Sequence, residues 1–163
     1  MKMLPLALVV ATSACHGAII VIPVSLDGSQ EVSPVTTTGT GTATVTVDDV
    51  LNTVEIMGSY TSMQSTVTMA HLHGFTGPDS NAGVLFGLTI SGGTDGTFSS
   101  PAVSRSAADI QQILAGQSYI NVHSSGVPSG EIRGQVVPTP VPEPSTLLLV
   151  AGGMIGLLKR RRS

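Results

Sequence analysis

Three histidines are the residues of this chain best suited to chemistry. His71 and His73 lie in the stretch Ala-His-Leu-His-Gly, and His123 ends the stretch Tyr-Ile-Asn-Val-His. Imidazole is the commonest metal ligand among side chains, and its charge changes near neutral pH. Only 10% of the residues are charged, so three histidines in two short, largely apolar stretches indicate a specific role.

Both histidine stretches alternate as β-strands do, with successive side chains on opposite faces. If the aliphatic residues of strands 67–73 and 118–123 face the core, all three imidazoles face outward. If the two strands are also neighbours, the three rings can converge on one ion, and imidazole ligands suit copper or zinc. We therefore predict a candidate metal site formed by His71, His73 and His123.

A structural role fits the same histidines. His71 and His73 would then hydrogen-bond loop backbone within residues 74–83, and His123 would hold the turn at 124–130. The residue types alone do not decide between the two hypotheses, and both are kept open.

Glu131 and Arg133 follow His123 in the stretch Glu-Ile-Arg-Gly-Gln and are predicted to lie near the site. In the structural hypothesis they form an ordinary ion pair across strands. In the metal hypothesis Arg133 is the candidate group that guides anions to the ion.

The histidine stretches belong to a longer β pattern. Residues 39–47 place Gly, Ala and Val on one side and four threonines on the other, as in a strand with one buried face. Turn-forming residues separate eight such stretches, at 20–26, 39–47, 53–60, 67–73, 84–90, 96–100, 118–123 and 131–137. We predict an all-β fold, an antiparallel sandwich or flattened barrel of seven or eight strands, immunoglobulin-like or superoxide-dismutase-like in shape.

One short helix interrupts the strands. It fits residues 106–114, with Ser104 or Ser106 as its N-cap and Gly116 just past its end. Asp48 and Asp49 predict a turn between two of the strands.

Both ends of the chain have the composition of targeting segments. Residues 1–18 combine Lys2, an apolar run and small residues, as a secretory signal peptide does. The mature domain is then expected over residues 19–137. A Pro-rich linker begins the C-terminal segment 138–163, which holds the motif Val141, Pro142, Glu143, Pro144 and Ser145, an apolar run at 146–158, and the basic residues Lys159, Arg160, Arg161 and Arg162.

The C-terminal order of motif, apolar run and basic tail resembles the PEP-CTERM sorting signal, which implies recognition by an exosortase in the inner membrane. The apolar run is shorter than the roughly 20 residues of a comfortable span, and the four positive charges would stop its transfer on the cytoplasmic side. We therefore expect a transient inner-membrane span, followed by C-terminal processing and release to the cell surface or extracellular matrix.

The charge of the central domain excludes one class of partner. Arg105 and Arg133 are its only basic residues, and the balance against nine acidic residues gives a formal charge of −7. An acidic domain without lysine or tryptophan cannot neutralise phosphates or stack bases, so nucleic-acid binding is not expected.

The single cysteine, Cys15, lies in the signal segment, so the domain has no disulfide. No phosphate loop or nucleophile elbow is present, and no catalytic residue is predicted.

Several motifs of the central region resemble those of the CHRD domain, a module named after chordin. They are Gln-Glu-Val-Ser-Pro-Val at 30–35, Gly-Thr-Gly-Thr-Ala at 39–43, both histidine stretches and the block from 106 to 135. The resemblance covers nearly the whole domain, with Ser33 in place of a second proline. The biochemical function of the family is poorly defined, so the resemblance by itself implies no mechanism.

A His-x-His on one strand with a single histidine on another also resembles the copper side of copper-zinc superoxide dismutases. The domain has no fourth histidine to bridge two metals, and the zinc ligands of those enzymes have no counterparts in the intervening loop. A dismutase is therefore not expected, whereas a copper or zinc site with three histidines is compatible with the sequence.

We expect an exported, surface-sorted protein that acts as a binding or structural module of the bacterial envelope or extracellular matrix rather than as an enzyme. An envelope protein or a polysaccharide would be its partner. The alternative is a copper- or zinc-binding redox protein centred on the three histidines.

Overall fold

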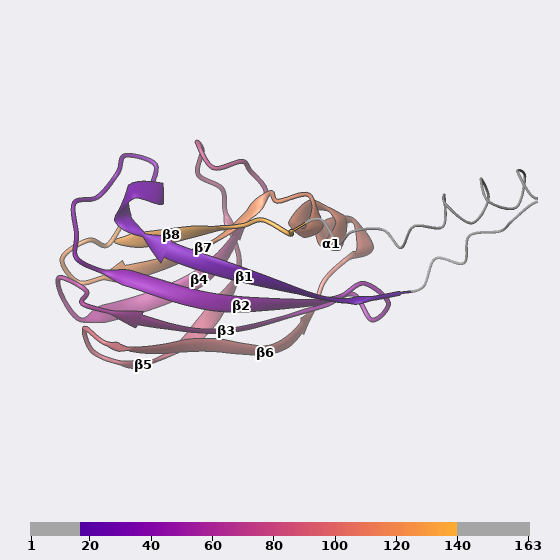
Figure 1. The fold of residues 1–163 in the computed structure, drawn as a ribbon, viewed down its shortest axis with the longest axis horizontal. Coiled ribbons are helices and arrows are strands. Elements are labelled where there is room, and N and C mark those ends of the chain that lie inside the picture. Colours follow the sequence, from indigo (N-terminus) through magenta and orange to yellow (C-terminus); the bar gives the residue numbers. More distant parts are fainter. Residues whose placement is uncertain (1–16, 140–163) are drawn as a thin grey trace, which may run out of the picture.

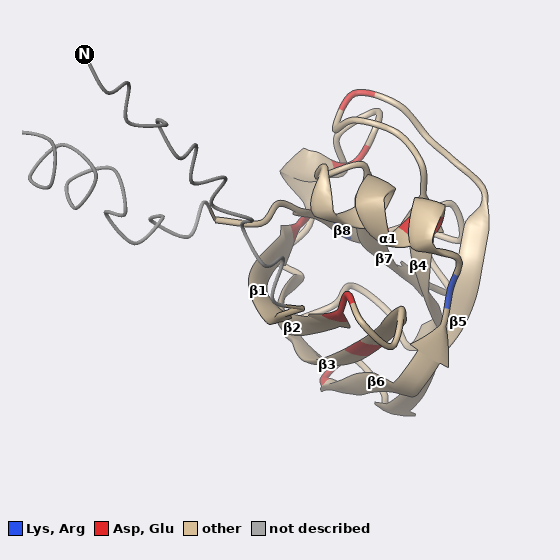
Figure 2. Ribbon diagram, turned by 90° about the vertical axis from the view of Figure 1, so that its right-hand side faces the viewer, with Lys and Arg blue, Asp and Glu red and all other residues tan. Residues whose placement is uncertain are grey.

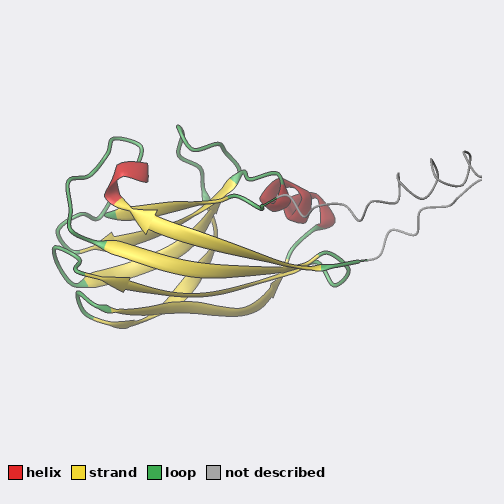
Figure 3. Cartoon of the chain, viewed as in Figure 1, coloured by secondary structure: helices red, strands yellow, loops and turns green. Residues whose placement is uncertain are grey.

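A computed structural model describes residues 17–139 of the chain. Eight β-strands make up most of it, as Figures 1 and 3 show. The strands are β1 (Ile19–Asp27), β2 (Thr40–Asp48), β3 (Thr53–Thr61), β4 (Val67–Gly74), β5 (Val84–Gly92), β6 (Gly96–Ser104), β7 (Ser118–Ser124) and β8 (Ile132–Val136). A short 3₁₀ helix, η1 (Gly28–Gln30), follows β1, and the helix α1 (Ala107–Leu114) precedes β7. The predicted strands are all present, with ends shifted by up to four residues.

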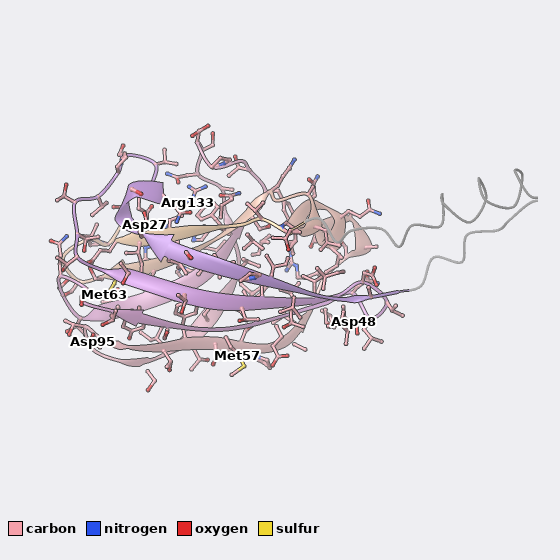
Figure 4. The ribbon with its side chains drawn as sticks, in the orientation of Figure 1. Asp27, Asp48, Met57, Met63, Asp95 and Arg133 are labelled. Atoms are coloured by element: carbon pink, nitrogen blue, oxygen red, sulfur yellow. The ribbon has the colours of Figure 1, made fainter. Side chains whose placement is uncertain are left out.

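The strands pair in the order β1-β2-β3-β6-β5-β4-β7-β8 and form a closed antiparallel barrel. Figure 2 shows the ring from one end. The ring closes where Asp27 of β1 pairs with Arg133 of β8, and Figure 4 labels both residues at this seam. The predicted all-β antiparallel fold with one short helix is confirmed, but its immunoglobulin-like or superoxide-dismutase-like sandwich form is not, because continuous pairing leaves one ring instead of two separate sheets.

Alternation along the strands produces the core. In β2 the small and apolar residues point inward, and Thr40, Thr42 and Thr44 are exposed on the outer face. The same period in the other strands fills the barrel with aliphatic side chains. The most deeply buried of them are Ile22, Val45, Val47, Val54, Ile56, Leu72, Ile120, Val122, Ile132 and Val136.

The helix α1 forms where the sequence predicts it. The Ser106 side chain accepts a hydrogen bond from the Asp109 N–H at 3.1 Å and caps the first turn. Gly116, with φ at +77°, follows the last turn, as a residue in the left-handed region commonly does. Ile110 and Ile113 are buried, so the helix covers part of one end of the barrel (Figures 1 and 2).

The turn between β2 and β3 is also as predicted. The Asp48 side chain accepts hydrogen bonds from the N–H groups of Val50 and Leu51 at 2.9 and 2.8 Å, and Asn52 adopts φ of 53°. This is the geometry of an Asx turn.

One side of the barrel departs from simple alternation. All seven residues of β7 are buried, on both faces of the strand, because loops cover its outer face. Figure 3 shows two long loops on the β4-β7-β8 side, and they correspond to residues 31–39 and 75–83. Within residues 17–139, no helix has the length and apolar character needed to span a bilayer.

Candidate metal centre

The three predicted histidines lie together on the outer face of two neighbouring strands. β4 and β7 pair antiparallel, with His71 opposite Asn121 and His73 opposite Tyr119. The core takes the aliphatic residues of both strands, so alternation sends His71, His73 and His123 to the other face. The predicted adjacency of the two strands is confirmed.

The three imidazoles are close enough to share one ion. One ring nitrogen from each of His71, His73 and His123 lies within 4.8 Å of the other two. Nitrogens bound to one tetrahedral ion at ordinary distances lie about 3.4 Å apart. Small rotations of the rings therefore bring the three nitrogens to coordinating distance.

Backbone carbonyls fix the tautomers of two of the rings. Nδ1 of His73 lies 2.9 Å from the Ala82 carbonyl, and Nδ1 of His123 lies 3.0 Å from the Pro128 carbonyl. A carbonyl oxygen only accepts, so both Nδ1 atoms are protonated and both Nε2 atoms carry a lone pair that can accept a hydrogen bond or bind a metal. Histidines that bind metals show this arrangement, with the other ring N–H donated to a carbonyl or carboxylate.

The two Nε2 atoms differ in their surroundings. His123 Nε2 lies 3.1 Å from Nδ1 of His71, and because Nδ1 of His123 is protonated, His71 is the donor of this pair. His73 Nε2 is buried and has no hydrogen-bond partner. Such an unpartnered buried atom is uncommon in folded proteins and requires an explanation.

Burial keeps the three rings neutral. Desolvation lowers the pKa of His71, His73 and His123 below the ordinary value of 6.5. For His73 and His123 the carbonyl hydrogen bond acts against this shift, and the charge of neighbouring histidines adds to it. Neutral imidazole is the form that binds metals, so the environment favours the ligand form near pH 7.

The histidine face is less open than the sequence suggests. The predicted outward direction is correct relative to the core, but loops cover this face, and His123 is only 8% exposed. Asn121 is 3% exposed and donates from Nδ2 to both carboxylate oxygens of Glu31, at 3.0 and 3.1 Å. Burial raises the pKa of Glu31 above its usual value.

Arg133 is fully buried beside the histidines, with an exposed fraction of 0%. Its two terminal nitrogens donate four hydrogen bonds, to the carbonyls of Ser80 (3.0 Å) and Gly77 (3.2 Å) and to the side chains of Asn81 (3.2 Å) and Gln135 (3.1 Å). Burial lowers its pKa, but the guanidinium remains charged at neutral pH. Both terminal nitrogens are bonded to protein groups and shielded from solvent, so this geometry gives no support to the predicted role of Arg133 in guiding anions.

Among the described residues, Glu131 and Arg133 do not form the predicted ion pair. The buried Glu131 carboxylate accepts from the Thr37 hydroxyl at 2.6 Å, from the Gln64 N–H at 2.8 Å and from the Ser124 hydroxyl. Its partners come from three separate loops or strand ends, so Glu131 fastens neighbouring loops together rather than balancing the charge of Arg133.

A comparison with protein-family models matches residues 22–136, most of the barrel, to the CHRD domain. The chain belongs to the CHRD domain family. Residues 140–162 match the PEP-CTERM protein-sorting motif, which implies export, exosortase processing and cell-surface sorting. Comparisons with curated proteins and with solved structures find no match. The sorting residues 141–145 and 159–162 lie outside the described part of the chain, as does most of the predicted signal peptide.

Tyr119 connects the buried arginine of this CHRD domain to the histidine cluster. The Arg133 guanidinium carbon lies 3.5 Å from the centroid of the Tyr119 ring, and that ring stacks on His73 with centroids 4.8 Å apart and planes 9° apart. The Tyr119 hydroxyl accepts from the Ala82 N–H at 3.1 Å and lies 3.3 Å from the Ala82 carbonyl, which also holds His73. One loop residue therefore fixes both stacked rings.

The alternation of β7 places Tyr119 and Asn121 on the same face as His123, but sequence reasoning named neither of them, nor Glu31, as a site residue. The available signal was the polar or aromatic character of alternate residues in β7, where Tyr119, Asn121 and His123 share the face opposite the core. Without the positions of the covering loops, that pattern indicates a surface exposed to solvent rather than a buried site.

Proposed function

We propose that this exported CHRD domain protein binds copper or zinc through His71, His73 and His123. The observation that carries the proposal is the state of His73, whose Nε2 is buried without a partner while its Nδ1 is held by the Ala82 carbonyl. A free lone pair directed into a cluster of two other imidazoles is what a metal ligand requires.

The rest of the site supports the same function. The lowered pKa values make the three rings neutral, and three neutral nitrogen donors leave a coordination position free for a further ligand. Copper bound here would supply one-electron redox chemistry, whereas zinc would not. The protein supplies ring orientation through the carbonyls of Ala82 and Pro128 and a partly covered, low-dielectric surrounding.

A second candidate function is a metal-free binding or structural module of the envelope or extracellular matrix. The outer face of the β1-β2-β3-β6-β5 side favours it, because cross-strand partners there place exposed hydroxyls in a row. The row consists of Ser25, Thr42, Ser59, Thr97 and Ser91. Hydroxyl groups both donate and accept hydrogen bonds, so such a face suits a polysaccharide or a protein.

Metal loading followed by elemental analysis distinguishes the two candidates. Protein incubated with copper or zinc and freed of excess metal is expected to retain one ion per chain. The variant His73→Ala is expected to retain none, because it removes the nitrogen that has no other partner. Ser125→Ala is the matched control, since Ser125 is exposed and lies two residues from His123. Absence of bound metal in the unchanged protein would leave only the envelope-module function.

We further propose that residues 1–18 are removed as a signal peptide and that the domain 19–137 is released after exosortase cleavage at the C-terminal motif. The match of residues 140–162 to the sorting motif supports this processing. The apolar run 146–158 and the basic tail 159–162 then stop the transfer of the chain across the inner membrane.

Replacing Pro144 with alanine is expected to leave the chain tethered to the membrane and unprocessed. The sorting enzyme reads the motif, whereas the apolar run and the basic tail, which hold the chain in the membrane, stay intact in this variant. Cell fractionation with size analysis checks the result, and Ser125→Ala in the same cells should be released normally. Deleting residues 159–162 should instead let the short apolar run slip through the membrane. Normal release of the Pro144→Ala variant would contradict the proposal.

A further inference from the structure

Met69 shares the outer face of β4 with two of the histidines. Residues 69, 71 and 73 alternate with the buried Ala70 and Leu72, so the thioether and both imidazoles point away from the core. Across the strand pair, Met69 is the direct partner of His123. The methionine therefore neighbours one ligand along its own strand and another across the sheet.

A β-bulge sets this register. The pairing of β4 with β7 shifts between Val67 and Met69, so that Val67 opposes Ser124 and Met69 opposes His123. Directly opposed residues on one face of an antiparallel pair have Cβ atoms about 4.5–5.5 Å apart. A methionine side chain has three rotatable bonds and spans such a distance readily.

Packing does not account for Met69. Its exposed fraction is 48%, so it is an exposed apolar side chain at the edge of a polar cluster. On β5, the other neighbour of β4, the residue opposite His71 is Gly87, which has no side chain. The cluster is therefore bordered by Met69 and Gly87 where the loops do not cover it.

We propose that the Met69 sulfur is a fourth ligand of this centre and makes it selective for copper, above all Cu(I), over zinc. This inference rests on the proposed function, because it needs the three histidines as the other ligands. A thioether is a soft ligand that favours Cu(I), whereas zinc sites in proteins use thiolate, imidazole and carboxylate. Three imidazoles bind both metals, so the fourth ligand decides between them.

The test compares Met69→Leu with Met57→Leu in the purified full chain. Both substitutions remove a sulfur from an exposed methionine and conserve side-chain volume. Met57 is 63% exposed on β3, which is across the ring from β7 in the strand order, and Figure 4 shows it at the outer surface of the barrel. Thermal melting of the metal-free variants verifies that each folds.

Competition with a colour-forming Cu(I) chelator under anaerobic, reducing conditions measures copper affinity, and a zinc-sensitive dye measures zinc affinity. Met69→Leu is expected to weaken Cu(I) binding about tenfold or more and to change zinc binding less than about twofold. Met57→Leu should change neither. X-ray absorption of the Cu(I) protein should show a copper–sulfur contact that Met69→Leu removes and Met57→Leu keeps.

The outcomes separate this inference from the function on which it rests. If the unchanged protein binds neither copper nor zinc, the proposed function fails. If it binds Cu(I) but Met69→Leu binds Cu(I) equally well, with no copper–sulfur contact in the unchanged protein, the three-histidine site stands and the role of Met69 is overturned.

Discussion

Replacing Arg133 with methionine is expected to lower the free energy of unfolding by about 1.5–3 kcal/mol, because it removes hydrogen bonds from a charged group that hold the covering loop to the barrel. Methionine keeps the apolar contact with the Tyr119 ring but leaves the acceptors on Gly77, Ser80, Asn81 and Gln135 without their donor. Such a loss is a large part of the total free energy of unfolding of a typical domain, which is about 5–15 kcal/mol. Urea unfolding followed by circular dichroism measures it.

Arg105 provides the matched control, because it is the other arginine among the described residues. It precedes α1 and pairs with Asp109 of that helix at 2.7 Å, and both side chains are 23% exposed. Partly exposed pairs of this kind contribute about 0–1 kcal/mol, so Arg105→Met should cost far less than Arg133→Met. Arg133→Lys should fall between the two, because one ammonium cannot reproduce the planar fork that reaches four acceptors. Equal losses for Arg133→Met and Arg105→Met would show that the buried network contributes little.

Copper or zinc is expected to raise the melting temperature of the protein near pH 7.5, and this gain is expected to fade toward pH 5. At a hundredfold excess of metal over the dissociation constant, binding to the folded state adds about 2.7 kcal/mol. For a domain of this size the shift is about 5–15 °C. Protonation of His71, His73 and His123 competes with the metal, which explains the loss in acid.

The metal-free protein should itself lose stability over the same pH range. The three histidines have lowered pKa values when folded, so below the ordinary value of 6.5 the unfolded chain binds more protons than the folded one. Their contribution to stability is therefore complete above pH 6.5 and is lost progressively as the pH falls from 6.5 through their lower folded-state pKa values. Glu31 acts in the opposite direction, because its raised pKa makes its protonation in acid favour the folded state.

Variants assign the metal effect to the cluster. His73→Ala should abolish the shift caused by metal, whereas Ser125→Ala should preserve it, and each variant is compared with its own metal-free form. Identical melting curves with metal and with chelator at pH 7.5 would eliminate the metal centre.

The local sequence pattern alone is sufficient to predict most of the secondary structure. Apolar residues with a period of two placed all eight strands, and the serine cap and following glycine placed α1. These signals lie within a few residues of each other, so no knowledge of distant contacts is needed. The same alternation put the histidines on one face, and adjacency of the two strands was the remaining assumption, which the pairing of β4 with β7 confirms.

Closure of the barrel was decided by tertiary structure. Strand periodicity is identical in a sandwich and in a barrel, so the sequence favoured neither form. The difference is the pairing of Asp27 with Arg133, residues at opposite ends of the domain sequence. A contact of that kind depends on the twist and stagger of all the intervening strands.

The sequence by itself therefore determined the β character of the domain, the shared outward face of the histidines on each strand and the C-terminal sorting motif, because each is written in neighbouring residues. Tertiary structure decided how the cluster is surrounded. Glu31 meets Asn121 across 90 positions of the chain, and Arg133 reaches the Gly77 carbonyl across 56. The carbonyls that fix the tautomers lie only 9 and 5 positions from His73 and His123, within the predicted segments 74–83 and 124–130. Loop paths across 56 to 90 positions set the burial of the site and the acceptors of Arg133. No local pattern encodes them, because they follow from how the closed barrel positions its loops.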